Sequence, residues 1–190
     1  MREYGGMWVF VRNRIEMPQP LAWMDEYTAT SYISSFSKIR LYIDTVLHKA
    51  DGSIALKSRL ELCAVDLETG KIRKSESVGV GEKTPAEETV FDIAYTKEKP
   101  VRGELIDEIT VRSADIDYCH HTNNVAYVRY FVNQIGADEL IERPVKAIEV
   151  QYAAQTYEGD RLGIYRCSSE NEAYVIEKEG AKVVSCIIIR

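Results

Sequence analysis

One stretch of ten residues concentrates several kinds of side chain that could do acid–base or carbonyl chemistry. It contains two carboxylates, a thiol, two imidazoles and two carboxamides, in the order Asp115-Ile116-Asp117-Tyr118-Cys119-His120-His121-Thr122-Asn123-Asn124. A carboxylate such as Asp117 can orient a water, and an imidazole such as His121 can hydrogen-bond a carbonyl oxygen or exchange protons. The stretch is therefore a candidate reactive site.

Several members of this stretch also allow simpler interpretations. Asp115 and Asp117 could be turn formers, Asn123 or Asn124 could merely cap the helix, and His120 is expected to be a solvated loop residue. Cys119 beside two histidines suggests a metal site or a nucleophilic thiol. However, no further ligand stands at zinc-like spacing, and adjacency in sequence does not supply the geometry of a Cys–His pair. We therefore expect no metal and no cofactor.

The neighbouring elements place this stretch between a strand and a helix. Residues 108–112 are predicted to form the strand, and residues 124–135 the only long helix, because their apolar side chains recur at helical spacing. Thr122 or Asn123 can cap the helix start, and Gly136 stands where a glycine commonly ends one. Amides at a helix N-terminus can stabilise an oxyanion.

Most of the remaining chain alternates polar and apolar residues, which is typical of strands. Hairpin turns are predicted at residues 50–53 and 179–180, and residues 183–189 are apolar enough on both faces to form a central strand. The two hairpins suggest a repeated unit. We therefore predict two like domains, 1–96 and 97–190, joined by a polar connector at 84–102. The first domain is expected to lack the strand and helix that open the second.

Residues 117–125 resemble the Asp-x-Asn-x-His-x-Asn-Asn motif of plant and bacterial acyl-acyl carrier protein thioesterases, which precedes the central helix of their second hot-dog domain. Residues 148–160 are similar to that family's following strand, and residues 7–73 show looser similarity to its first domain. The resemblance implies an α+β fold of two tandem hot-dog domains, with antiparallel sheets wrapped around a central helix and the first domain incomplete.

The resemblance also implies an activity, namely a thiolester hydrolase that releases free fatty acid from acyl carrier protein in fatty acid biosynthesis. The family's active site falls on Asp117, position 119, His121 and position 155. Cys119 replaces an Asn of the motif, and Gln155 stands where a catalytic Glu is usual. Because a glutamine has no ionisable carboxylate, Gln155 could position the water but not deprotonate it. Contacts to the substrate are expected from three further residues: Asn123, Asn124 and Thr156.

In this family the first domain helps to shape a tunnel for the acyl chain. Four aromatic residues could line it, although ordinary core packing is the stronger expectation for each: Trp8, Phe10, Trp23 and Tyr27. Two other functions stay open. The chain could bind an acyl thioester or a lipid without turnover, or it could be an acyl-CoA thioesterase. A dehydratase of the same fold is less well supported.

The composition indicates which classes of partner the protein can bind. A net charge of −6 and the lack of a basic stripe argue against nucleic acid. Acyl carrier protein is itself acidic, so docking it would require a local basic patch. The four scattered cysteines, the lack of a signal peptide and the lack of roughly 18 consecutive apolar residues predict a cytoplasmic protein that does not enter membranes. An uncovered sheet face in the first half favours a homodimer.

Overall fold

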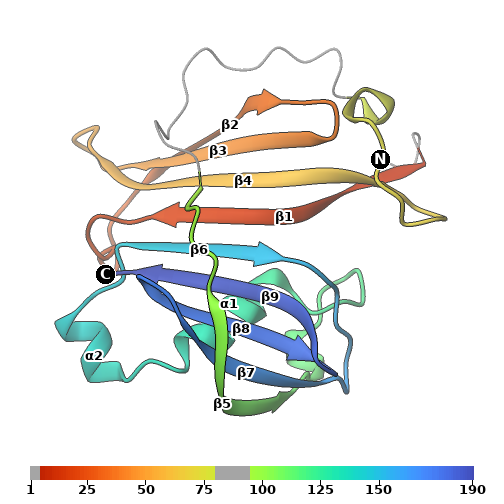
Figure 1. Cartoon of the computed structure of the whole chain (residues 1–190). Coiled ribbons are helices and arrows are strands. Elements are labelled where there is room, and N and C mark those ends of the chain that lie inside the picture. The colour runs from red at the N-terminus through yellow and green to blue at the C-terminus, as the bar shows by residue number, and fades with distance from the viewer. Residues whose placement is uncertain (1–4, 80–94) are drawn as a thin grey trace. The chain divides into compact units, whose positions relative to one another are not determined.

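The computed structural model describes residues 5–79 and 95–190. The chain divides into two compact units, Met1–Tyr95 and Thr96–Arg190 (Figure 1). The predicted connector at 84–102 lies mostly outside the described residues, and its last two residues belong instead to a strand that begins at Val101. In the described ranges, no helix combines the length and the apolar character that crossing a membrane requires.

The first unit contains an antiparallel sheet of four strands in the order β2-β3-β4-β1. The strands and a short 3-10 turn run as follows: β1 (Gly6–Glu16), β2 (Thr28–Phe36), β3 (Arg40–His48), β4 (Ile54–Asp66) and η2 (Ser75–Val78). The predicted hairpin at residues 50–53 joins β3 to β4, and Gly52 has the positive φ of 82° that the turn requires. Leu41 and Leu62 lie opposite each other in this ladder and form the centre of a small apolar cluster.

The aromatic residues of the first unit differ in their surroundings. Trp8 packs against the Leu41–Leu62 cluster, which agrees with a core role. Trp23, by contrast, is 91% exposed in the loop between β1 and β2, so it is not a core residue. Tyr27 holds this loop in place, because its hydroxyl accepts the Ala22 amide at 3.2 Å and donates to Asp25 at 3.3 Å. Local hydrogen bonds rather than apolar burial therefore shape this loop.

The second unit contains an antiparallel sheet of five strands in the order β6-β9-β8-β7-β5. Its elements run as follows: β5 (Val101–Thr110), η3 (Ser113–Asp115), α1 (Asn124–Val132), α2 (Ala137–Glu142), β6 (Ala147–Tyr152), β7 (Arg161–Ser168), β8 (Glu172–Lys178) and β9 (Ala181–Ile189). The predicted central strand is confirmed, since β9 lies between β6 and β8 and buries adjacent residues on both faces. The predicted turn at Glu179 and Gly180 is also confirmed, with φ of 51° and 79°.

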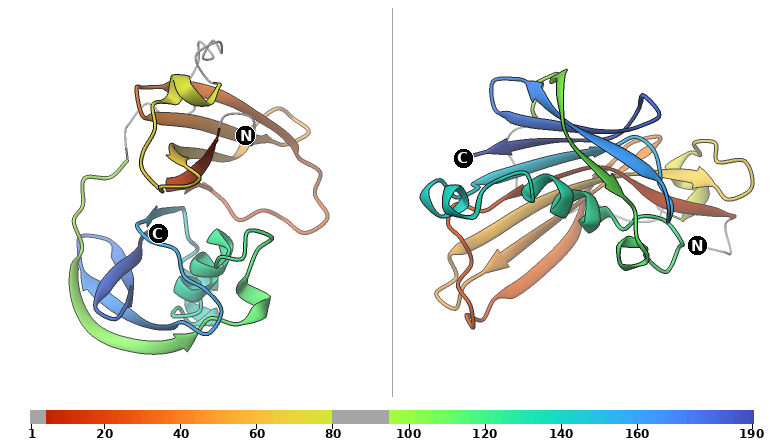
Figure 2. Two further views of the ribbon diagram at one scale, coloured as in Figure 1. Left: turned by 90° about the vertical axis from the view of Figure 1, so that its right-hand side faces the viewer. Right: turned by 90° about the horizontal axis from the view of Figure 1, so that it is seen from below.

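Helix α1 packs against this sheet, and Figure 2 shows it within the curve of the strands. Ala126, Tyr127 and Phe131 enter one buried cluster with residues of β6 to β9. Fully burying an aromatic such as Phe131 stabilises a fold by about 1.5–3 kcal/mol. This packing fixes the position of the helix start, where the candidate site lies.

Three sequence predictions around α1 are wrong. The helix ends at Val132 rather than at residue 135, because the amides of Gln134 and Ile135 bond to carbonyls three residues back and tighten the last turn. This turn brings Ile135 into the core at 7% exposure. Gly136 does not end α1, since it has a φ of −63° and caps the start of α2. The strand predicted at 108–112 also begins earlier and ends at Thr110.

The two units share a strand order. In the first unit β4 lies between β3 and β1, and in the second β9 lies between β8 and β6 with the same antiparallel pairing. The second unit adds β5 beyond β7 and the helix α1 before β6. In residues 5–79 the first unit has no α-helix. The β3–β4 and β8–β9 hairpins therefore occupy equivalent places in their sheets, and the predicted α+β class is confirmed.

Candidate active site

The central feature of the site is a tight turn at residues 117–121, between η3 and α1. The Asp117 amide donates to the His121 carbonyl at 2.9 Å, and the His120 amide donates to the Asp117 carbonyl at 3.0 Å. His120 takes up a left-handed φ of 64° to close the turn. Asp117 Oδ1 accepts the Cys119 amide at 2.8 Å. The Asp117 and His121 backbones are thus joined, and both side chains are half-buried.

Asp115 connects this turn to the residues before it and to α1. Its buried carboxylate accepts the Arg112 amide at 2.9 Å and pairs with the Arg129 guanidinium on α1. Its carbonyl accepts the Asn123 amide at 2.7 Å. The structural interpretation of Asp115 is therefore confirmed, because these bonds tie the entrance of the turn to its exit and to the helix.

The N-terminus of α1 follows directly. Asn123 is the N-cap, and its side-chain oxygen accepts the Val125 amide at 2.9 Å. The Asn123 carbonyl accepts the Ala126 amide at 2.9 Å. The Asn124 amide also belongs to the first turn of α1. Within the described part of the chain, this amide has no protein acceptor. Such an amide, aided by the helix dipole, can donate to an oxyanion.

The loop after β6 is hydrogen-bonded to this turn. The Thr156 carbonyl accepts the Thr122 amide at 2.8 Å. The Thr156 hydroxyl lies 2.6 Å from the Thr122 hydroxyl and 2.7 Å from the Tyr127 hydroxyl, so three hydroxyls form one buried cluster. Thr156 is 0% exposed. A residue this buried cannot contact a substrate in the way expected of Thr156. Its hydroxyl instead connects the loop after β6 to Thr122 and to Tyr127.

Tyr157 brings a second contact from the same loop to the turn. Its ring meets the His121 imidazole edge-on, with ring centroids 5.3 Å apart and an interplanar angle of 71°. Asp160 holds the Tyr157 backbone, since its carboxylate accepts the Tyr157 amide at 3.0 Å and pairs with Lys178 at 2.8 Å. Although burial alone would raise the pKa of Asp160, the bonds to Lys178 and Tyr157 lower it below its ordinary value of 3.8.

The structure gathers most of the predicted residues but does not join them all. Asp117, Cys119 and His121 share the turn, and Asn124 opens the helix beside it. Gln155 is exposed in the neighbouring loop, one residue before Thr156. Among the described residues, no side-chain hydrogen bond links Asp117, Cys119 or Gln155 to His121. The thiol of Cys119 therefore has no imidazole base in contact.

Three residues of the site were not found from sequence: Tyr127, Tyr157 and Asp160. Tyr127 gives no signal in the sequence, because the hydroxyl that it contacts belongs to a residue 29 positions away. Tyr157 follows Gln155 in the segment that resembles the thioesterase strand. Its place two positions after Gln155 is the sequence signal that could have identified it.

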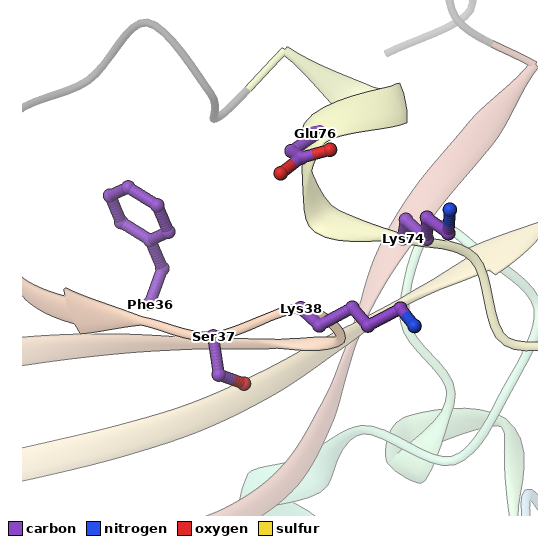
Figure 3. Close-up of a pocket in the computed structure, with 5 residues that line it drawn as sticks. All are labelled: Phe36, Ser37, Lys38, Lys74 and Glu76. Carbon is purple, nitrogen blue, oxygen red and sulfur yellow. The ribbon is translucent and has the colours of Figure 1, made fainter.

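Two cavities of the described residues lie in the first unit. One, of about 470 Å³, is lined by Phe36, Ser37, Lys38, Lys74 and Glu76 (Figure 3). The other, of about 280 Å³, lies beside the loop that starts at Pro18. The candidate site is thus defined by its side chains and the helix start rather than by either cavity.

Comparison with known proteins finds a family match in the unit that contains this turn. Residues 98–187 match the acyl-ACP thioesterase C-terminal domain family. No curated protein sequence matches the chain significantly.

Solved structures show the fold. An acyl-ACP thioesterase from Bacteroides thetaiotaomicron superposes with a TM-score of 0.88 at 19% identity, over 99% of this chain and 78% of that one. A 12:0-ACP thioesterase from Umbellularia californica gives a TM-score of 0.79 at 16% identity, over 99% of this chain and 76% of that one. A MaoC-like dehydratase from Phytophthora capsici gives a lower TM-score of 0.58 at 13% identity, over 97% of this chain and 72% of that one.

The antiparallel sheets, the helix against the second of them and these similarities define an α+β protein of the hot-dog class, as predicted. The C-terminal unit is similar to the C-terminal domain of acyl-ACP thioesterases over residues 98–187, just under half of the chain. Members of this family are thioester hydrolases.

Proposed function

We propose that the chain hydrolyses fatty acyl-acyl carrier protein by attack of a water held at the turn 117–121, releasing free fatty acid. The observation that carries this proposal is the position of Asp117 and His121 at the N-terminus of α1, within the segment that matches the family. A thioester carbonyl near the Asn124 amide would have a donor for its developing negative charge.

The two proposed catalytic residues have different roles. One oxygen of Asp117 is held by the Cys119 amide, which leaves the other oxygen free to accept a proton from water. The His121 imidazole, fixed on one side by Tyr157, can hydrogen-bond the substrate or donate a proton to the departing thiolate. As the water attacks, the C–S bond breaks, and the products are a carboxylic acid and a thiol.

Gln155 and the asparagines are proposed to assist. Gln155 is exposed beside the buried Thr156, so its amide can reach a water at the surface of the site. Asn123 shapes the helix start and Asn124 supplies its free amide. Cys119 is proposed to shape the turn through its own amide, since its thiol has no base in contact in the described part of the chain.

The proposal is tested by mixing the purified chain with acyl-acyl carrier protein and acyl-CoA substrates of several chain lengths and following thiol release. Release above the buffer rate is expected from the carrier-protein substrates. Absence of release from every substrate would refute hydrolysis. If ligand-dependent thermal stabilisation were then observed, the non-catalytic acyl-binding function would be favoured.

The proposed setting is the cytoplasm, with the chain acting as a homodimer in fatty acid biosynthesis. All four cysteines are free thiols, which suits a reducing compartment. The sheet of the first unit carries an apolar cluster of which only Leu41 and Leu62 are fully buried, and no α-helix lies in residues 5–79. Light scattering after size exclusion is expected to give twice the mass of 21.6 kDa.

A further inference from the structure

Two copies of one tripeptide, Lys-Ile-Arg, meet at one end of the first unit's sheet. The first copy is Lys38-Ile39-Arg40, at the turn that opens β3, and the second is Lys71-Ile72-Arg73, after the turn that follows β4. Arg40 pairs with Cys63 in the β3–β4 ladder, and the Arg73 amide donates to the next residue of β4, Ala64, at 2.8 Å. The copies therefore lie end to end along the same side of β4.

A further backbone bond ties the two segments together. The Ser75 amide donates to the Lys38 carbonyl at 2.9 Å, which places Lys74 beside the first copy. Lys38 and Lys74 both line the 470 Å³ cavity together with Phe36. In Figure 3 the two lysine side chains extend to the same side, whereas the Glu76 carboxylate points away from their ammonium groups.

The two kinds of cation in these segments have different surroundings. Arg40 pairs with Glu61 at 2.8 Å, and Arg73 lies 3.9 Å from Asp66, so both guanidinium groups are neutralised within the unit. The three lysines are exposed, and none forms an ion pair with a carboxylate in the described ranges: Lys38, Lys71 and Lys74. The arginines therefore stabilise the unit, while the lysines present positive charge to solvent.

The isoleucines of both copies are also exposed, Ile39 at 37% and Ile72 at 56%. Exposed apolar side chains surrounded by cations are typical of a protein–protein interface, where an apolar centre is flanked by charges that guide association. We name this set of five exposed residues the Lys-Ile surface: Lys38, Ile39, Lys71, Ile72 and Lys74.

We propose that the Lys-Ile surface is the docking surface for the acidic acyl carrier protein, an inference that rests on the proposed function. The chain as a whole carries a net charge of −6 and would repel an acidic partner, so a local cluster of unpaired lysines is needed to bring the two together. The two isoleucines supply apolar area that an acidic helical partner can cover.

The test uses charge reversal on the full chain. The variant Lys38→Glu/Lys74→Glu alters two exposed side chains, and the control Lys49→Glu/Lys182→Glu reverses two exposed lysines elsewhere. For each protein, kcat/KM is measured with acyl-acyl carrier protein and with the acyl-CoA of equal chain length. Binding of fluorescently labelled carrier protein that bears phosphopantetheine but no acyl chain is measured separately by anisotropy.

We expect Lys38→Glu/Lys74→Glu to lower kcat/KM for the carrier-protein substrate by about tenfold, with the acyl-CoA value within about twofold of wild type. Carrier-protein affinity should fall by a similar factor, and the control should change neither. Unchanged affinity in the Lys38→Glu/Lys74→Glu variant, or an equal loss with both substrates, would overturn the docking surface. Because anisotropy needs no turnover, this result is independent of whether hydrolysis is observed.

Discussion

The Thr156 carbonyl accepts the Thr122 amide at 2.8 Å, and the hydroxyls of the two residues lie 2.6 Å apart. Thr122 closes the turn that carries Asp117 and His121, whereas Thr156 follows Gln155 in the loop after β6. The contact joins residues 34 positions apart. The buried hydroxyl cluster therefore holds the loop of Gln155 against the turn of Asp117 and His121, two segments that are distant in the chain.

Replacing Thr156 by Val should destabilise the protein and disturb catalysis. The change leaves the buried hydroxyls of Thr122 and Tyr127 without a shared partner, which costs about 1–3 kcal/mol in the free energy of unfolding. We expect kcat for thioester hydrolysis to fall more than KM rises, measured by thiol release.

Two variants control for this effect. Thr156→Ser keeps the hydroxyl and should restore most of kcat. Thr45→Val removes a hydroxyl that lies 2.7 Å from Ser31 in an exposed pair of the first unit, and it should change stability by less than about 0.5 kcal/mol with no change in kcat. A full rate in Thr156→Val would show that the cluster does not position the site.

Replacing Tyr157 by Leu should alter the surroundings of the His121 imidazole. Leucine keeps an apolar side chain but removes the ring that meets the imidazole at 5.3 Å. An aromatic pair of this kind contributes about 0.5–1.5 kcal/mol beyond its area burial. We expect a shifted His121 ring resonance in the NMR spectrum and a lower kcat, whereas Tyr157→Phe should behave as wild type. Identical spectra for the Leu and wild-type proteins would contradict a positioning role.

Asp160 predicts a pH dependence of stability. Because its pKa in the folded state lies below the ordinary 3.8, the carboxylate stabilises the fold above that pH, and this stabilisation is lost as the pH falls through the folded pKa. Asp160→Asn should therefore be less stable than wild type at pH 7, with a difference that shrinks below pH of about 4. Urea unfolding over this range measures it, and a difference independent of pH would argue against the Lys178 contact.

Two substitutions of Gln155 should differ in their effect on kcat. If its amide only positions the water, Gln155→Ala should lower kcat by about 10- to 100-fold, while Gln155→Glu should keep kcat within about tenfold because a side-chain oxygen remains. The Glu variant should also gain a new acidic limb in its pH–rate profile. If Gln155→Ala hydrolysed at the wild-type rate, Gln155 would have no place in the site.

Local features of the fold were predictable from sequence. Gly52 and Gly180 marked both hairpins, because each turn needs a backbone conformation that glycine adopts freely. Asn123 marked the start of α1 through its capping side chain, and the unbroken apolar residues of β9 marked a central strand. Each of these signals depends on neighbours within a few positions.

Features decided by tertiary packing were not predictable. Helix α1 stops at Val132 because Ile135 is drawn into the core, a result that its helical spacing does not contain. Thr156 was predicted to contact substrate, yet its partners Thr122 and Tyr127 come from a distant segment and bury it. The contact of Tyr157 with His121 likewise exists only once β6 and the turn are assembled.

The central claim is that Asp117 activates the water that cleaves the thioester, and Asp117→Asn tests it most directly. Asparagine retains an oxygen that can accept the Cys119 amide, so the turn should persist while the base is removed. We predict that the single-turnover rate of acyl-acyl carrier protein hydrolysis falls by at least about 100-fold, with unchanged thermal stability. Hydrolysis at the wild-type rate by a folded Asp117→Asn protein would contradict the proposed mechanism.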